Sequence, residues 1–228
     1  MIPAEIRAVF FDAVGTLIFP HPSAPQVYAA VGQRHGSRLT VPVITERFRR
    51  AFQRQEQLDL GRDLRTSESR EAERWRQIVG EVLDDVDDAE ACFRELFVHF
   101  ARADAWRCDP EAGPVLEQLA QCGYLLGLAS NYDARLRSVA AGLPELRPVR
   151  YLVISAEVGW RKPAPEFFAA LCERVGLGPR QILLVGDDWV NDYQGAQQTG
   201  LHAVLLDPAA ESEAGGARIG RLRELLGE

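Results

Sequence analysis

Short apolar segments alternate with helical patterns through the second half of the chain, and this alternation limits the possible folds more than any other feature. Four segments have the character of buried strands, namely Tyr124–Ala129, Tyr151–Ile154, Gln181–Val185 and His202–Leu206. Helices are predicted around them at about Glu111–Gln121, Asp133–Ala141, Pro165–Val175, Tyr193–Thr199 and Arg218–Leu226. Right-handed crossovers join strands and helices in such an order into a parallel sheet that helices cover on both faces. The sequence therefore predicts an α/β domain.

One more strand is predicted at the N-terminus, ahead of a long stretch of different character. Ile6–Phe11 is a nearly continuous apolar run that ends in a turn. From about His21 to Asp109 no strand is expected, and helical patterns such as the four-residue spacing of Ile44 and Phe48 dominate instead. With one strand before it and about four after it, this stretch is predicted to be an insertion into the α/β domain.

Charge and composition argue against several functional classes. The 228 residues carry a formal net charge of −7, whereas a nucleic-acid-binding surface would be basic. No apolar run approaches the roughly 20 residues of a membrane-spanning helix, and the N-terminus lacks a signal-peptide pattern. The cysteines show no metal-binding spacing and are expected to be buried thiols in a reducing compartment: Cys92, Cys108, Cys122 and Cys172. We expect a cytoplasmic protein that binds neither nucleic acid nor membrane, of undetermined oligomeric state.

Polar residues follow the predicted strands at the end where open parallel sheets bind their ligands. Asp12 follows the first strand, Ser130 and Asn131 follow the second, and Asp187 and Asp188 follow the fourth. Because the carboxyl ends of parallel strands meet along one edge, these side chains are expected to lie close together.

Lys162 belongs to the same edge, in the loop beyond the third strand. It is the single lysine of a chain that otherwise uses arginine for its cationic residues. Lysine carries a compact point charge, whereas the guanidinium of arginine is a planar fork. The retained lysine suggests a position where only the compact charge fits.

These residue types suit the transfer of a phosphoryl group. Asp12 can attack phosphorus and form an aspartyl-phosphate, while Lys162 and Ser130 stabilise charge on the phosphate oxygens. Asp187 and Asp188 are candidate oxygen ligands for Mg²⁺, which would screen the repulsion between a carboxylate and a phosphate dianion. Asn191 and Asp192 are predicted to hold Lys162 or a metal-bound water, and with Asp188 they would surround the residues that contact metal and substrate.

The same residues resemble the four motifs of the haloacid dehalogenase-like hydrolase superfamily, in the same order. The matching segments are Phe10–Leu17, Ala129–Asn131, Lys162–Pro163 and Gly186–Asp192. Each motif is short, but the ordered set is highly specific and spans most of the chain. The chain is most similar to a capped subgroup that includes the rhythmically expressed gene proteins.

The resemblance implies a Rossmann-like parallel-sheet core made of residues 1–19 and 108–228. An all-helical cap, residues 20–107, would be inserted after the first motif and close over the site. Asp12 would be the nucleophile, and Mg²⁺ would be held by Asp12, the backbone carbonyl of Val14 and Asp187. A small phosphorylated metabolite would be bound by Thr16, Ser130, Asn131 and Lys162.

Val14 departs from the pattern of the phosphatases in this superfamily. They usually carry a second aspartate at that position, which protonates the leaving oxygen and later activates water. Loss of such a general acid–base costs about 10²–10⁴ in rate. His21 is a candidate replacement, although a loop histidine before a proline is more often simply solvated.

Three functional interpretations follow from this departure. The first is a phosphatase for esters with good leaving groups, such as acyl or aryl phosphates. The second is a haloacid dehalogenase acting without metal, although such enzymes generally carry Ser and Asn where this chain has the crowded acidic pair Asp187 and Asp188. The third is a binding protein with weakened catalysis. A phosphonate-cleaving enzyme is excluded because it needs a cap lysine, and the predicted cap contains none.

Overall fold

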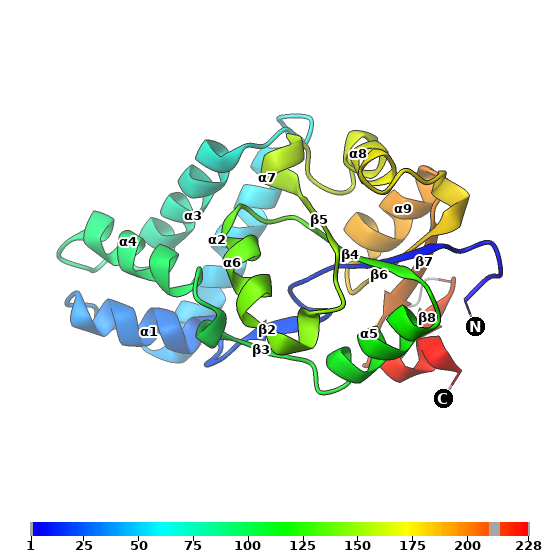
Figure 1. The fold of residues 1–228 in the computed structure, drawn as a ribbon. Coiled ribbons are helices and arrows are strands. Elements are labelled where there is room, and N and C mark those ends of the chain that lie inside the picture. The colour runs from blue at the N-terminus through cyan, green and yellow to red at the C-terminus, as the bar shows by residue number, and fades with distance from the viewer. Residues whose placement is uncertain (1, 210–214, 228) are drawn as a thin grey trace.

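The computed structural model describes residues 2–209 and 215–227 and divides visibly into two parts (Figure 1). A sheet with helices packed against it occupies one side of the molecule. Four helices from the first half of the chain occupy the other side.

The sheet confirms the predicted α/β architecture. Six parallel strands lie in the order β5-β4-β1-β6-β7-β8. Their bounds are β1 Ala8–Phe11, β4 Leu125–Ser130, β5 Tyr151–Ile154, β6 Ile182–Gly186, β7 His202–Leu206 and β8 Arg218–Ile219. The first strand of the chain therefore lies in the middle, between β4 and β6, as expected for a doubly wound sheet.

Helices and helical turns connect the strands and cover both faces of the sheet. The helices are α5 Ala112–Gln121, α6 Arg135–Gly142, α7 Ser155–Val158, α8 Pro165–Val175 and α9 Gly195–Gln198. Shorter turns occur at Ala103–Ala105, Pro144–Leu146, Pro179–Gln181 and Leu222–Leu226, and a π-helical turn at Trp189–Gln194.

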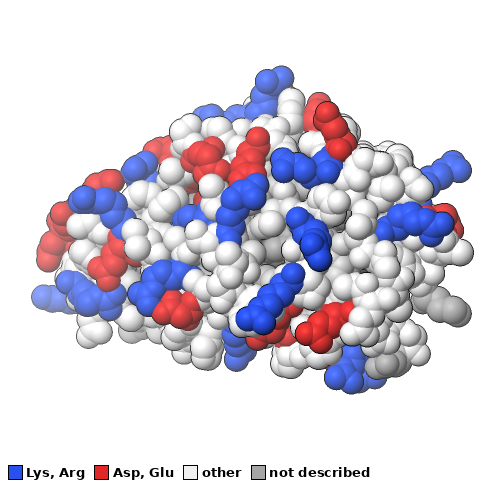
Figure 2. Space-filling view, in the orientation of Figure 1, with Lys and Arg blue, Asp and Glu red and all other residues white. Residues whose placement is uncertain are grey.

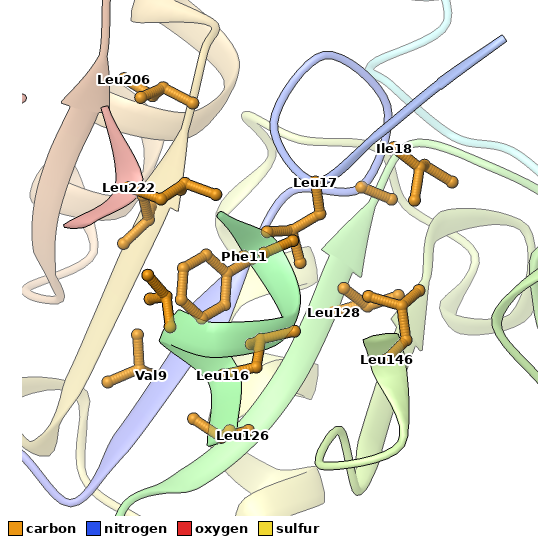
Figure 3. Packing of buried hydrophobic residues seen from close by; sticks show 14 of the residues in the cluster. Val9, Phe11, Leu17, Ile18, Leu116, Leu126, Leu128, Leu146, Leu206 and Leu222 are labelled. Carbon is orange, nitrogen blue, oxygen red and sulfur yellow. The ribbon is translucent and has the colours of Figure 1, made fainter. Parts of the chain in front are cut away.

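Two hydrophobic clusters, one on each face, hold this part of the molecule together. Successive residues of β1 point to opposite faces, so Val9 and Phe11 join one cluster and Ala8 and Phe10 the other. Figure 3 shows Val9 and Phe11 among leucines from α5, β4 and the C-terminal segment. All four residues of β1 are fully buried, which explains the unbroken apolar run in the sequence.

The helical segment, which we define as residues 24–99, contains α1 Ala24–Arg34, α2 Val41–Leu60, α3 Glu68–Val82 and α4 Ala89–His99. It has a hydrophobic cluster of its own, in which Tyr28, Ile44 and Ile78 are fully buried. The residues spaced by three and four along each helix form these buried faces.

A short antiparallel ribbon, which the sequence did not indicate, joins the two parts. It pairs β2, Ile18–Pro20, with β3, Trp106–Cys108, at the two points where the chain enters and leaves the helical segment. Each strand has only three residues, too few for a period-two pattern to be recognised.

The C-terminal helix predicted at Arg218–Leu226 was wrong. Arg218 and Ile219 form the edge strand β8, and a 3-10 turn follows at Leu222–Leu226. Ile219, Leu222 and Leu225 do pack into the hydrophobic cluster, so their spacing indicated burial correctly but not the backbone conformation.

One further expectation changes at the surface. Cys122 is exposed, contrary to the prediction of a buried thiol, because it follows the last turn of α5. Cys92 is buried and the other two cysteines are half-buried.

On the face shown in Figure 2, acidic and basic side chains are interspersed. Within the described residues no helix is both long and apolar enough to cross a membrane.

Candidate active site

The carboxyl edge of the sheet brings together the residues that the sequence placed after separate strands. Asp12 follows β1 directly, Ser130 ends β4, and Asp187 follows β6. Because β1 lies between β4 and β6, these three positions are neighbours. Lys162 reaches them from the loop between α7 and α8.

The ammonium of Lys162 is fully buried and uses all three of its protons. Its Nζ donates to Asp12 Oδ1 at 2.7 Å, to Asp192 Oδ1 at 2.5 Å and to the carbonyl oxygen of Ala129 at 2.7 Å. The side chain is 2% exposed. A compact ammonium satisfies three acceptors in this confined space, which accounts for the single lysine of the chain.

Burial and neighbouring charges together raise the pKa values of all three ionised groups. Burial alone would lower the pKa of Lys162, but Asp12 and Asp192 outweigh it and raise that pKa. Burial raises the pKa of Asp192 to about 6, with Lys162 opposing. Burial and the charge of Asp187 raise the pKa of Asp12, again against Lys162. Two carboxylates thus share one ammonium, which does not fully offset their dehydration.

Three carboxylates converge at this edge. Asp12, Asp187 and Asp192 each have an oxygen within 4.8 Å of the others. Asp187 lies at the open side of the cluster, and partial burial together with Asp192 raises its pKa. An all-oxygen donor set of this kind suits a hard divalent cation.

Thr16 and Gly15 fix the position of Asp187. The Thr16 hydroxyl donates to Asp187 Oδ1 at 2.9 Å. Gly15 has a φ of +102°, and a Cβ at this position would lie 2.4 Å from Asp187 Oδ2. Only glycine allows the carboxylate to lie so close to the backbone. Thr16, predicted to bind substrate, therefore contacts the candidate metal ligand.

Asn131 and Ser130 contact different partners. The Asn131 amide bridges the backbone of Lys162, accepting from its N–H at 2.7 Å and donating to its carbonyl at 3.0 Å. Both ends of this carboxamide thus hold the lysine loop. Ser130 is buried and lines the cavity described below.

The residues after β6 form a support for the site. Asp188 accepts from the backbone N–H groups of Val190 and Asn191, both at 2.8 Å, and from the Asn191 side chain at 3.0 Å. It therefore caps the turn that carries Asp192. Asp192 in turn accepts from the Asp188 N–H and from Lys162.

A cavity of about 410 Å³ opens from these residues into the helical segment. Its polar end contains Asp12, Lys162 and Asp187, with Val14 beside them. Its other end contains seven aromatic side chains, which we call the aromatic belt. They come from the helical segment, the residue that follows α4, the ribbon and the loop after β4: Tyr28, Phe48, Phe52, Trp75, Phe100, Trp106 and Tyr132. His21 is exposed, and it is not among the described residues that line this cavity.

Arginine side chains at the cavity belong to an ion-pair cluster that sequence reasoning missed. Arg161 pairs with Glu71 of α3 across the boundary between the two parts. Arg74 donates to Asp59 at 3.1 Å and to Glu56 at 2.7 Å. No sequence signal reveals these pairs, because the partners lie on different elements and charged helix residues are usually solvated.

Backbone bonds strengthen the same boundary. The N–H of Thr66 donates to the carbonyl of Gly159 at 3.0 Å, and that of Arg161 donates to Leu64 at 2.9 Å. The guanidinium of Arg65 stacks 4.5 Å above the ring of Trp160. The loop that ends in Lys162 is thereby fixed to the helical segment.

We expect the replacement Glu71→Gln to lower the free energy of unfolding at neutral pH by about 1.5–3 kcal/mol, since a buried charge-assisted bond to Arg161 is lost. Burial alone would raise the pKa of Glu71, but Arg161 and Arg74 outweigh it and lower that pKa. A lowered acid pKa contributes stability that is fully present above the unfolded value of about 4.5 and is lost as pH falls through the folded pKa. The difference between wild type and variant should therefore shrink in acid.

Urea denaturation from pH 7 to pH 3 measures this difference. Glu73→Gln is the matched control, because Glu73 lies on the same helix but pairs with Arg76 at the surface, and exposed pairs contribute little. If the difference in unfolding free energy between wild type and Glu71→Gln stayed constant across this pH range, the proposed stabilisation of the Glu71 carboxylate by Arg161 would be contradicted.

Comparisons with known proteins identify the family of this chain. The family model described as haloacid dehalogenase-like hydrolase matches residues 6–200. The "Haloacid dehalogenase-like hydrolase domain-containing protein 3" of Xenopus laevis is 25% identical over 90% of this chain and 85% of its own. The phosphoserine phosphatase of Thermus thermophilus is 33% identical over 66% of this chain and 63% of its own. The L-2-haloacid dehalogenase structure from Xanthobacter autotrophicus superposes with a TM-score of 0.73 at 17% identity, covering 96% of both chains.

Proposed function

Since the chain belongs to the haloacid dehalogenase-like hydrolases, we propose that it is a phosphatase-type hydrolase that cleaves a small phosphorylated molecule through Asp12. One observation carries this proposal: a buried ammonium and three convergent carboxylates surround the end of β1. The phosphatase relative from Thermus thermophilus supports it. At 17% identity, the dehalogenase structure supports only the fold.

Asp12 would act as the nucleophile. Its Oδ1 is held by Lys162, which leaves the second carboxylate oxygen to attack phosphorus and form an aspartyl-phosphate. Water would then attack the phosphorus, release inorganic phosphate and regenerate the carboxylate. Ser130 faces the same cavity and would donate to a phosphate oxygen.

The donor set fits Mg²⁺. Asp12 and Asp187 have raised pKa values, in part because each has a neighbouring carboxylate, and a divalent cation would relieve this repulsion. We propose Asp12, Asp187 and the Val14 carbonyl as its protein ligands, because Asp192 is already engaged by Lys162 and the Asp188 N–H. When bound, Mg²⁺ polarises the transferring phosphoryl group and screens its charge.

We also propose that residues 20–107 act as a cap over a core formed by residues 1–19 and 108–228. The cavity supports this division, since its polar end comes from the sheet and its aromatic end mainly from the helical segment. The ribbon β2–β3 crosses at the two junctions.

A metal-free dehalogenase is the second candidate, because Val14 leaves the site without a second acid. The acidic cluster weighs against it. Without a cation, burial and the charge of Asp187 raise the pKa of Asp12 and disfavour the ionised form that must attack. Chloride release from a 2-haloacid in the presence of a chelator would support this alternative. Tight binding of phosphate analogues without turnover of any ester would instead support a catalytically weakened binding protein.

Rapid-quench mass spectrometry tests the proposed function. With an activated phosphate ester and Mg²⁺, we expect a covalent adduct of one phosphoryl group, located on Asp12 by peptide mapping. The adduct should persist unusually long, since Val14 cannot activate the water that hydrolyses it. A chelator should abolish both adduct and phosphate release. Turnover without any adduct on Asp12 would reject the mechanism.

A further inference from the structure

The cavity beyond Asp12 points to the chemical class of the substrate. We propose that the substrate is the phosphate monoester of an uncharged aromatic alcohol, an inference that rests on the phosphatase-type function proposed above. The leaving group would occupy the aromatic belt, with its phosphate at Asp12. The volume of about 410 Å³ lies within the range of pockets that bury small organic molecules.

The aromatic belt is a continuous series of contacting rings. From Trp75 the contacts run through Phe52, Phe48 and Tyr28 at centroid distances of 6.4, 6.2 and 5.3 Å. They continue through Phe100, Trp106 and Tyr132 at 6.3, 5.9 and 6.1 Å. Such a wall favours a flat apolar ring, which gains both burial and ring–ring contact.

The arginines at this end of the cavity do not provide an anion-binding site. Arg74 is bonded to Asp59 and Glu56 and stacks on Phe52 at 4.5 Å. Its charge is therefore already compensated. Within the described residues, each of the other two lining arginines also has a carboxylate partner.

Arg135 and Arg161 complete this pattern. Arg135 forms a two-point contact with Asp133, at 2.8 and 2.7 Å, and donates to the Phe97 carbonyl at 3.2 Å. Arg161 pairs with Glu71 and lies 3.6 Å from Asp59. A second anionic group on the leaving alcohol would meet compensated cations and the carboxylate of Glu56, which also lines the cavity.

Val14 also favours an aromatic leaving group over an alkyl one, because its side chain cannot protonate the departing oxygen. Attack by the Asp12 oxygen forms an O–P bond while the bond between phosphorus and the leaving oxygen breaks with its electron pair. Without a carboxylic acid at position 14, that oxygen departs as an anion and takes its proton from solvent. A phenol, with a pKa of about 10, leaves as its anion far more readily than an alkyl alcohol, whose pKa is close to the value of about 15.7 for water.

A matched series of esters tests the proposal on the intact protein with Mg²⁺. Phenyl phosphate should exceed cyclohexyl phosphate in kcat/KM by about 10²–10⁴-fold, since the two are similar in size but differ in leaving-group pKa. It should exceed 4-carboxyphenyl phosphate by about 100-fold or more because of like-charge repulsion. Equal turnover of phenyl and 4-carboxyphenyl phosphate would overturn the assignment.

Phosphonates, which the protein can bind but not hydrolyse, test the proposed ligand class independently of the proposed reaction. Phenylphosphonate has no ester bond to cleave and should quench the fluorescence of Trp75 and Trp106 at lower concentration than methylphosphonate. Phe52→Leu should weaken phenylphosphonate binding about 2–10-fold and leave methylphosphonate unchanged. Phe93→Leu is the control, because Phe93 is buried in the same segment but outside the cavity.

The outcomes distinguish the two proposals. Preferential phenylphosphonate binding without turnover of any ester would remove the phosphatase function and retain the ligand class. Turnover with no preference for phenyl over methyl compounds would retain the function and overturn the ligand class. Loss of binding in Phe93→Leu equal to that in Phe52→Leu would also overturn it, because it would trace the effect to altered packing.

Discussion

Asp12→Asn is expected to reduce phosphate release by roughly 10⁴-fold or more, since it removes the nucleophile while keeping the shape of the side chain. Stability should not fall with activity. The pKa of Asp12 is raised in the folded protein, mainly by burial, so its charge opposes folding at neutral pH. The neutral amide removes that cost, and Lys162 keeps Asp192 as a partner.

Steady-state kinetics and thermal unfolding without divalent cations measure the two effects separately. Asp109→Asn is the matched control, since the Asp109 carboxylate accepts from the Glu111 N–H in a turn outside the cavity. It should retain full activity. A large drop in the melting temperature of Asp12→Asn would mean that its activity loss reflects unfolding, and residual turnover near wild type would exclude Asp12 as the nucleophile.

Val14→Asp is expected to raise the turnover of alkyl phosphates by about 10²–10⁴-fold, because it supplies a proton donor for poor leaving groups. Val14 is half-buried and lines the cavity beside Asp12. A carboxyl at this position would lie near the acidic cluster, which should raise its pKa and keep it protonated. Turnover of aryl phosphates should change little, since their leaving groups need no proton.

Val14→Asn is the control for this gain, because it matches aspartate in size and polarity but cannot transfer a proton. Parallel assays with cyclohexyl and phenyl phosphate compare the variants. A gain that appeared equally with asparagine would show that polarity or space, and not proton transfer, limits the natural chain. If neither variant turns over alkyl phosphates faster than wild type, the missing acid is not the cause of their slow turnover.

These two positions explain why the leaving group matters to the proposed function. Asp12, the proposed nucleophile, accepts a hydrogen bond from the Lys162 ammonium at 2.7 Å. Val14 lies beside it and cannot assist the departing oxygen. The aromatic belt then supplies an environment for alcohols that depart without assistance. Specificity for such alcohols would follow from the chemistry of one side chain and the lining of one cavity.

Several features were predictable because they depend on local patterns. The apolar run of β1 and the alternation after Asp109 were sufficient for the parallel sheet and its helices. The family assignment from the four motifs is confirmed by the matching family model. The three-residue strands of the ribbon and the C-terminal strand β8 escaped prediction, because pairing to a neighbouring strand defines them more than their own sequence does.

In the site, the position of a residue could be predicted from the sequence even where its contacts could not. Sequence order placed Asp12, Lys162 and Asp187 at one edge of the sheet, because strand direction alone puts them there. Asn131 was expected to bind substrate, yet both ends of its amide hold the Lys162 backbone. Its partner lies 31 residues away, and no local spacing encodes that contact.

The sequence by itself determined the α/β architecture, the order of the motifs and the absence of an acid at position 14, because each is a property of consecutive residues. Only the tertiary structure decided that one ammonium serves two carboxylates, that Arg161 pairs with Glu71, and that seven aromatic rings meet around one cavity. These contacts join segments that are distant in the chain. Their geometry depends on how whole elements pack, which the period of a helix or strand does not specify.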